Sequence, residues 1–96
     1  MYLEIISPEA ILFNGNIDSL TVPGSEGSFQ VLENHAAIVS NLISGSVVFK
    51  GNFDISNNFE DPFIKIDSNS IALKISSGTL EILDNKIILL IDQSLQ

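Results

Sequence analysis

This chain of 96 residues contains no cysteine, no arginine and no tryptophan, and histidine and tyrosine occur once each. Without cysteine there is no disulfide bond, no thiolate nucleophile and no cysteine-ligated zinc. Without arginine the chain lacks the planar group that reads phosphates and guanine bases. Nucleic-acid binding also needs clustered cations, and the four lysines are widely spaced along the chain. The sequence therefore argues against a nucleic-acid-binding protein.

Long hydrophobic runs are also missing. No segment reaches the roughly 18 consecutive apolar residues of a membrane-spanning helix. The N-terminal segment MYLEIISPE has neither a basic stretch nor a hydrophobic stretch followed by a small-residue cleavage site, so it is not a signal peptide. We expect the chain to be cytosolic, or to lie on the cytosolic face of a larger assembly.

The charge is strongly acidic. Twelve aspartates and glutamates stand against four lysines, which gives a formal net charge of −8. An acidic surface suits a basic partner or serves solubility, and solubility is the commoner reason. The charge alone does not decide between the two.

The apolar residues favour strands over helices. There are fifteen isoleucines, eleven leucines, six phenylalanines and five valines against only four alanines, a balance that suits pleated, half-buried positions. No window carries helical apolar spacing over three turns. We therefore predict an all-β fold for residues 1–96, a single domain. It is a flattened sandwich or barrel of about nine or ten short, mostly antiparallel strands.

The stretch from Val22 to Leu42 has the densest turn chemistry. Pro23-Gly24 and Glu26-Gly27 supply a fixed φ and two residues that tolerate positive φ. A short strand follows, Glu33-Asn34 turns again, and residues 36–42 are expected to run extended. We predict that the two turns lie near each other at one rim of a sheet, as a docking surface and not a catalytic centre.

A hairpin is predicted near the N-terminus. Residues 2–6 form a strand that ends at Ser7-Pro8, and residues 11–13 form a second, short strand. Asn14-Gly15 is the strongest short-range hairpin signal, so residues 17–22 are expected to return antiparallel to residues 11–13.

The last strand, residues 86–91, is apolar on both faces, unlike a half-buried sandwich strand. Either it is central and covered on both sides, or its outer face meets another protein.

Catalytic chemistry finds little support. Histidine is the residue type that most often serves as a general acid or base, and His35 is the only one, with Glu33 and Ser40 as its only nearby candidate partners. A lone histidine in a turn is more often a structural hydrogen-bonding group. We predict no catalytic residue.

Ligand sites are not predicted either. Asp54, Glu60, Asp61 and Asp67 lack the alternating oxygens and central glycine of a calcium loop, so a solvated acidic surface is expected. Residues 24–27 precede no helix and no Lys-Ser/Thr pair, so they are not a phosphate cradle. The six phenylalanines are interpreted as core and not as a stacking platform. We expect no metal, no cofactor and no small-molecule ligand.

The order of the short motifs resembles the epsilon chain of F-type ATP synthases. The segment MYLEIISPEAILFNGNIDSLTVPGSEGSFQVLENHAAIV is similar to the start of that family: a strand ending in Ser-Pro, a Phe-x-Gly hairpin, a Pro-Gly-x-x-Gly-x-Phe turn and an Asn-His-Ala segment. Residues 75–82 resemble its Ser-Gly-Gly strand pair, and Asp84-Asn85-Lys86 leads into the last strand. The resemblance covers nearly the whole chain.

Several positions depart from that family. Glu33 and Ala37 replace two prolines of its Pro-Gly-His-Ala-Pro segment, so we expect a less rigid rim. Ser77 replaces a glycine. The segment between Val47 and Ser76 is longer, which predicts an extra hairpin around residues 53–66. The chain stops at Gln96, so the family's C-terminal helical pair, which blocks rotation, is not expected.

The resemblance implies a non-catalytic rotor subunit of a proton-translocating ATP synthase. It would link the gamma chain to the membrane c-ring and lie peripherally on the cytoplasmic face of the bacterial inner membrane. The ring-contacting positions that the resemblance implies are Glu26, Gly27, Ser28, Phe29, Asn34 and His35. The family's ring loops carry an arginine, which the nearby carboxylates would complement. Ile88 and Leu90 are the candidate gamma-chain contacts.

Two other classes stay open. A free-standing β-sandwich module that binds carbohydrate or peptide usually displays Trp or Tyr for stacking, and this chain has only Tyr2. An enzyme is the third class, and it depends on His35 alone.

Overall fold

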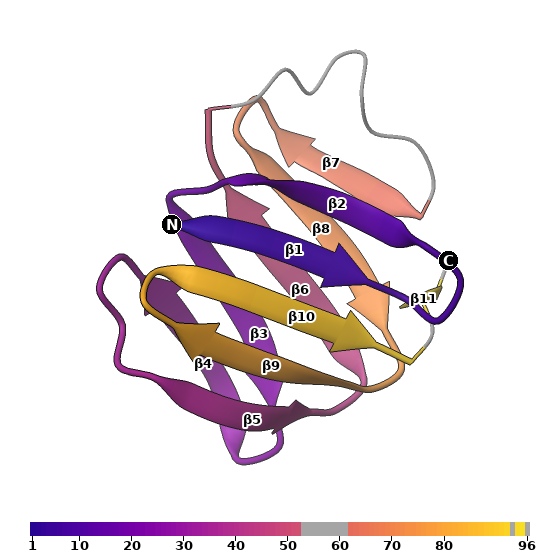
Figure 1. Cartoon of the computed structure of the whole chain (residues 1–96). Coiled ribbons are helices and arrows are strands. Elements are labelled where there is room, and N and C mark those ends of the chain that lie inside the picture. The colour runs from indigo at the N-terminus through magenta and orange to yellow at the C-terminus, as the bar shows by residue number, and fades with distance from the viewer. Residues whose placement is uncertain (53–61, 93, 96) are drawn as a thin grey trace.

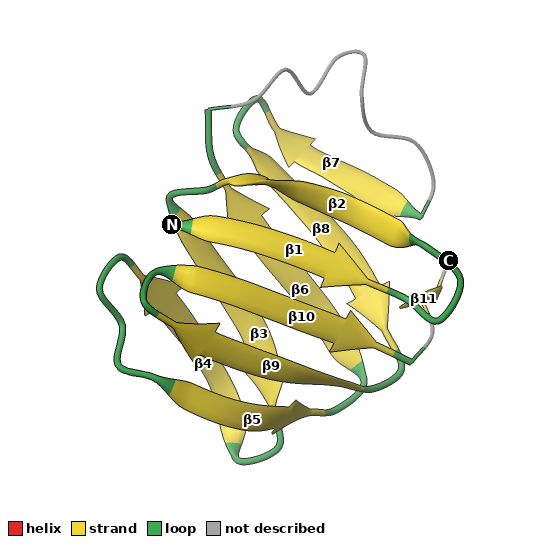
Figure 2. Ribbon diagram, viewed as in Figure 1, coloured by secondary structure: helices red, strands yellow, loops and turns green. Residues whose placement is uncertain are grey.

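The structure is a computed structural model that describes residues 1–52, 62–92 and 94–95. The described residues form eleven strands and no helix, as expected for an all-β fold (Figure 2). The strands are β1 (Tyr2–Ile6), β2 (Ile11–Asn16), β3 (Ser19–Gly24), β4 (Gly27–Leu32), β5 (Ile38–Leu42), β6 (Gly45–Lys50), β7 (Phe63–Asp67), β8 (Ser70–Ile75), β9 (Gly78–Leu83), β10 (Lys86–Ile91) and β11 (Ser94–Leu95).

The strands form one continuous hydrogen-bonded sheet, which folds over on itself into two layers. The order is β11-β8-β6-β3-β5-β9-β10-β1-β2, with β4 added to β3 and β7 added to β8. In Figure 1, β5, β9, β10, β1 and β2 lie in front of β3, β6 and β8. A single bridge between Gly24 and Leu42 joins β3 to β5 and so connects the layers. Every described pairing is antiparallel except β1 with β10, so the predicted mostly antiparallel sandwich is confirmed.

The core lies between the two layers, because alternate residues of each strand point inward. In β10, for example, Ile87, Leu89 and Ile91 are buried, while the residues between them are not. Each buried leucine or isoleucine contributes about 1.5–3 kcal/mol relative to exposure. The buried residues of the cluster are Leu3, Ile5, Ile17, Leu20, Val22, Val31, Leu42, Val47, Phe49, Ile71, Leu73, Ile75, Leu80, Ile82, Ile87, Leu89 and Ile91.

Three phenylalanines close the core between β2 and β7. The ring of Phe49, which is fully buried, lies 4.7 Å from the ring of Phe13 and 6.1 Å from that of Phe63, measured between centroids. These tilted and edge-on arrangements are the favourable ones for aromatic pairs. The prediction of a core role is confirmed for these three, whereas Phe53 and Phe59 lie outside the described residues.

The predicted Asn14-Gly15 hairpin is wrong. Strand β2 runs through both residues to Asn16, and Gly15 pairs with Leu3 of β1. The chain then crosses to the other layer, where β3 pairs with β4, β5 and β6 but not with β2. The crossing buries Ile17, and its N–H donates to the carbonyl of Met1 at 2.9 Å. Pairing with β1 and burial of this side chain outweigh the local turn preference.

The turn expected at Pro23-Gly24 lies two residues further along. Both residues belong to β3, and the hairpin loop is Ser25-Glu26, because Gly24 pairs with Gly27. A Cβ on Gly24 would lie 2.7 Å from the carbonyl oxygen of Gly27, so this glycine permits the close approach of two strands. The extra hairpin predicted around 53–66 is described only from its later part, where β7 begins at Phe63.

Candidate functional site

The six positions expected to contact a ring fall into two groups at opposite ends of β4. Glu26, Gly27, Ser28 and Phe29 lie at the start of the strand, whereas Asn34 and His35 follow its end. At about 3.3 Å per residue, the strand separates the groups by roughly 17 Å. The prediction that both turns lie at one rim is therefore wrong. The reason is that β4 has six residues, whereas the sequence predicted a shorter strand between the two turns.

The first group is held by the strands that flank it. The N–H of Ser25 donates to the carbonyl of Asn41 in β5 at 3.1 Å, which ties the hairpin loop to the other layer. Gly27 has a φ of +124°, a conformation that favours glycine. Glu26 is exposed, while Phe29 packs against the core. The exposed Glu26 and the anchored Phe29 both line a depression of about 260 Å³.

The second group is held by hydrogen bonds to a residue far away in the sequence. Asn34 has a φ of 66°, and its N–H donates to the side-chain oxygen of Asn85 at 2.6 Å. The side-chain nitrogen of Asn85 donates in return to the side-chain oxygen of Asn34 at 3.0 Å. We call this pair of hydrogen bonds the amide clamp. It joins the β4–β5 loop, residues 33–37, to the β9–β10 hairpin, 51 positions later in the sequence.

His35 forms hydrogen bonds to its neighbours in the turn. Its N–H donates to the carbonyl of Leu32 at 3.1 Å, and its ring Nδ1 lies 2.8 Å from the carbonyl oxygen of Ala36, to which the protonated nitrogen donates. This is the hydrogen-bonding role that the sequence favours for a turn histidine. Around it lies a polar depression of about 430 Å³, lined by Asn34, His35, Ala36, Ala37, Asp84 and Asn85.

The last strand is central in the sheet but covered on one face only. Strand β10 lies between β9 and β1, and its inner residues belong to the core. Ile88 is half-buried and Leu90 is 41% exposed on the opposite face. No described strand packs over this outer face, so the alternative of a strand covered on both sides is not observed among the described residues, and contact with another protein stays a prediction.

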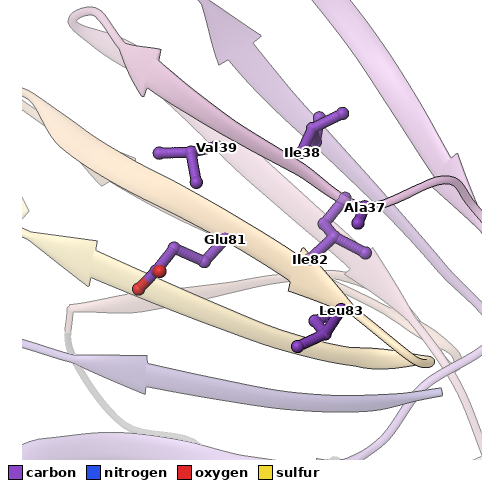
Figure 3. A pocket seen from close by; sticks show the side chains of 6 residues that line it. All are labelled: Ala37, Ile38, Val39, Glu81, Ile82 and Leu83. Atoms are coloured by element: carbon purple, nitrogen blue, oxygen red, sulfur yellow. The ribbon is translucent and has the colours of Figure 1, made fainter.

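An apolar groove that the sequence did not reveal runs between β5 and β9 on the same outer face (Figure 3). Val39 is 72% exposed and Leu83 is 63% exposed, and Glu81 pairs with Val39 across the two strands. The groove has a volume of about 370 Å³ and is lined by Ala37, Ile38, Val39, Glu81, Ile82 and Leu83. The period-2 alternation of each strand places Val39 and Leu83 outside, but only the pairing of β5 with β9 brings them together.

The outer face of the sheet continues from the groove toward β10 and β1. Glu81 pairs with Ile88 of β10, and Ile88 pairs with Glu4 of β1. Two carboxylate-bearing residues therefore flank one isoleucine in a single cross-strand row. A surface of this kind suits a partner that brings apolar side chains together with a cation.

Asp67 of the discarded calcium cluster caps a turn. The N–H of Asn69 donates to its Oδ1 at 2.8 Å, and this hydrogen bond, with contributions from Ser70 and Lys50, lowers the pKa of Asp67 from its ordinary value. Asp54, Glu60 and Asp61 lie outside the described residues. Within the described ranges, no three histidine or acidic side chains gather as a metal site. The same ranges contain no helix of the length and apolarity needed to cross a membrane.

Comparison with solved structures places this fold among ATP synthase components. A chain of the Tetrahymena thermophila mitochondrial ATP synthase, in a central stalk/c-ring structure, matches 99% of this chain and 65% of its own length. The TM-score is 0.76 and the sequence identity is 12%. A chain of the Euglena gracilis mitochondrial ATP synthase matches 97% of this chain and 51% of its own, with a TM-score of 0.73 and 15% identity. At these identities the likeness shows the fold.

Sequence relatives are ATP synthase epsilon chains. That of Leptospira interrogans (serovar copenhageni) is 42% identical over 80 residues, which are 82% of this chain and 63% of the relative. That of Sulfurovum sp. (strain NBC37-1) is 33% identical over 92 residues, 96% of this chain and 61% of the relative. The chain thus spans about three-fifths of the length of these relatives. The family model for the ATP synthase, Delta/Epsilon chain, beta-sandwich domain, matches residues 1–96, and the chain belongs to this family.

Proposed function

We propose that this chain is a non-catalytic central-stalk subunit of a proton-translocating F-type ATP synthase. Residues 1–96 act as one β-sandwich domain that links the gamma chain to the c-ring and couples rotation to ATP synthesis or hydrolysis. The observation that carries the proposal is the match of the epsilon-chain family over all 96 residues. The subunit lies peripherally on the cytoplasmic face of the bacterial inner membrane, and catalysis belongs to other chains.

The proposed c-ring contact runs along β4. This strand pairs only with β3, so its other edge is free of described strands. Ser28, Gln30 and Leu32 are exposed on its outer face, between the two groups of predicted contact residues. Glu26 and Glu33 lie near the two ends of β4, so the proposed contact surface carries a negative charge at each end. A ring loop with an exposed cation is the complementary partner.

The proposed gamma-chain contact is the outer face of β5, β9 and β10. Ile88 and Leu90 lie on it, and the groove of Val39 and Leu83 extends it across the neighbouring strands. Exposed leucine and valine side chains on adjacent strands form the apolar centre that a stable protein interface needs. Because Glu81 carries a negative charge, we expect the part of the partner that faces it to carry a cation.

The role in the complex is tested by affinity purification of the tagged chain from membranes, followed by identification of the co-purifying proteins. Recovery of the gamma and c chains is expected. Recovery of neither, with a folded tagged chain, would refute the assignment to the central stalk.

The gamma face is tested by placing a charge on it. Leu90→Glu is expected to lower recovery of the gamma chain at least tenfold, because an unpaired carboxylate would be buried in the interface. Ile88→Glu should act in the same direction. The matched control is Ile66→Glu, since Ile66 is exposed on β7, away from this face. Normal assembly of the Leu90 and Ile88 variants would rule out this face as the gamma contact.

A further inference from the structure

The amide clamp lies beyond the end of a strand pair. Strands β5 and β9 pair from Leu42 with Gly78 to Ile38 with Ile82, and no further residue pairs are formed between them. Residues 33–37 of the β4–β5 loop belong to no strand. The His35 hydrogen bonds are local, to Leu32 and Ala36. Among the hydrogen bonds of the described residues, those of the Asn85 side chain attach this loop to a distant element.

The backbone of both turns that the clamp joins has positive φ angles. Asn34, Asp84 and Asn85 have φ values of 66°, 51° and 61°, and they are the three described non-glycine residues with positive φ. Asparagine and aspartate tolerate this region better than other side chains. Asp84 and Asn85 form the two-residue loop of a tight hairpin, in which both central residues need positive φ. The loop therefore directs the amide of Asn85 toward residues 33–37 with a fixed geometry.

We propose that Asn85 is a positioning residue for the Glu33–His35 turn, and that the β9–β10 hairpin is thereby part of the surface that meets the c-ring. This inference rests on the proposed function. The clamp fixes the distance between two exposed carboxylate residues, Glu33 on one loop and Asp84 on the other. A loop of the partner that carries a cation and hydrogen-bond donors is the chemistry that matches this acidic pair. Asn85 itself acts through Asn34 and makes no contact with the partner.

Three glycine substitutions separate the clamp from the turn that carries it. Glycine accepts positive φ without strain, so each variant keeps the backbone conformation. Asn85→Gly removes both hydrogen bonds of the clamp, and Asn34→Gly removes only the one that the Asn34 side chain accepts. Asp84→Gly removes neither hydrogen bond and is the matched control for the hydrogen-exchange measurement.

The first measurement is amide hydrogen exchange at residue 34 in the purified full chain. Loss of the hydrogen bond to Asn85 is expected to speed exchange of this amide about five- to tenfold in the Asn85→Gly variant. The rate in Asp84→Gly should stay within about twofold of the unmodified chain. Unchanged exchange in Asn85→Gly would overturn the inference, because the loop would then be held by other contacts.

The second measurement is the ratio of ATP-driven proton pumping to ATP hydrolysis in the assembled complex. Asn85→Gly is expected to lower this ratio about two- to fivefold and Asn34→Gly less, although both chains assemble. Asp84→Gly is left out of this measurement, because it removes one carboxylate of the acidic pair. An unchanged ratio in Asn85→Gly, in a complex that still contains this chain, would overturn the positioning role and leave the proposed function standing. Absence of gamma and c chains from the membrane purification would instead remove the proposed function.

Discussion

The turns at the two ends of β4 are held in place by different means. Residues 25–26 form a two-residue loop between paired glycines, and one hydrogen bond to Asn41 fixes the loop against β5. Residues 33–37 form a longer connection whose distant attachment is the side chain of Asn85. The first turn is built by the pairing of its own two strands and is joined to β5 by one backbone hydrogen bond, whereas the second is attached by a side chain of the β9–β10 hairpin. Substitutions should therefore act on the two ends in different ways.

The largest effect is expected from Gly24→Ala at the locally built end. The new methyl group would lie 2.7 Å from the carbonyl oxygen of Gly27 and 2.8 Å from the ring of Phe29, so backbone must move. Overpacking of this kind costs about 1–3 kcal/mol. Denaturant unfolding of the purified chain measures it. Ser28→Ala is the control, because Ser28 is exposed, and it should change the unfolding free energy by less than about 0.5 kcal/mol. Equal stability of the two variants would contradict this account of the hairpin.

The next effect is expected from Asn85→Ala at the remotely held end. Alanine tolerates a φ of 61° less well than asparagine does, and together with the loss of the two exposed hydrogen bonds the cost is about 1 kcal/mol. Thermal unfolding of Asn85→Ala and Asn85→Gly separates the two contributions, since glycine removes only the hydrogen bonds. The alanine variant should be the less stable of the pair. If the two unfold at the same temperature, the backbone conformation of this hairpin is not as described.

A smaller effect is expected from reversing one charge at each end. Glu26→Lys and Glu33→Lys should each weaken ATP-driven proton pumping by up to about fivefold, with less change in soluble ATP hydrolysis, because an exposed charge pair contributes about 0.2–1 kcal/mol. The two together should exceed either alone if β4 lies along the ring. Glu9→Lys is the control, since Glu9 is exposed between β1 and β2. Equal loss of both activities would exclude the ring contact, and an effect at only one end would restrict the contact to that end.

The smallest effect concerns Asp67, which holds a third turn by a local hydrogen bond. Because the pKa of this carboxyl is lowered in the folded chain, its contribution to stability is present above the ordinary value of 3.8 and is lost as the pH falls through the folded pKa. Asp67→Asn keeps an acceptor for Asn69 but does not titrate. Thermal unfolding between about pH 5 and pH 2 should therefore show a slightly weaker acid dependence in this variant. Superimposable acid profiles would contradict the lowered pKa.

The sequence predicts those features that depend on neighbours along the chain. The turn at Asp84-Asn85 and the turn at Glu33-Asn34 are both present in the structure. Each needs only residues that tolerate positive φ. The resemblance of short motifs, taken in order, also identified the family that the profile over residues 1–96 shows.

The features that failed depend on residues far apart in the sequence. Asn14-Gly15 has strong hairpin chemistry, but Gly15 pairs with Leu3 and the chain crosses to the other layer. The groove of Val39 and Leu83 exists only because β5 pairs with β9. The amide clamp joins two turns that were predicted separately. It attaches residues 33–37, for which the sequence predicted a less rigid rim, to the β9–β10 hairpin.

The parallel pairing of the first strand with the tenth has a consequence for synthesis. Tyr2 pairs with Lys86 and Ile6 with Leu90, across 84 positions of the chain. During translation β1 emerges first, yet one of its two neighbours does not exist until residues 86–91 have been made. Pairings of such long sequence separation form slowly, and an uncovered strand edge is prone to associate with other chains. The front layer of the nascent domain therefore stays open at β1 until residues 86–91 have left the ribosome.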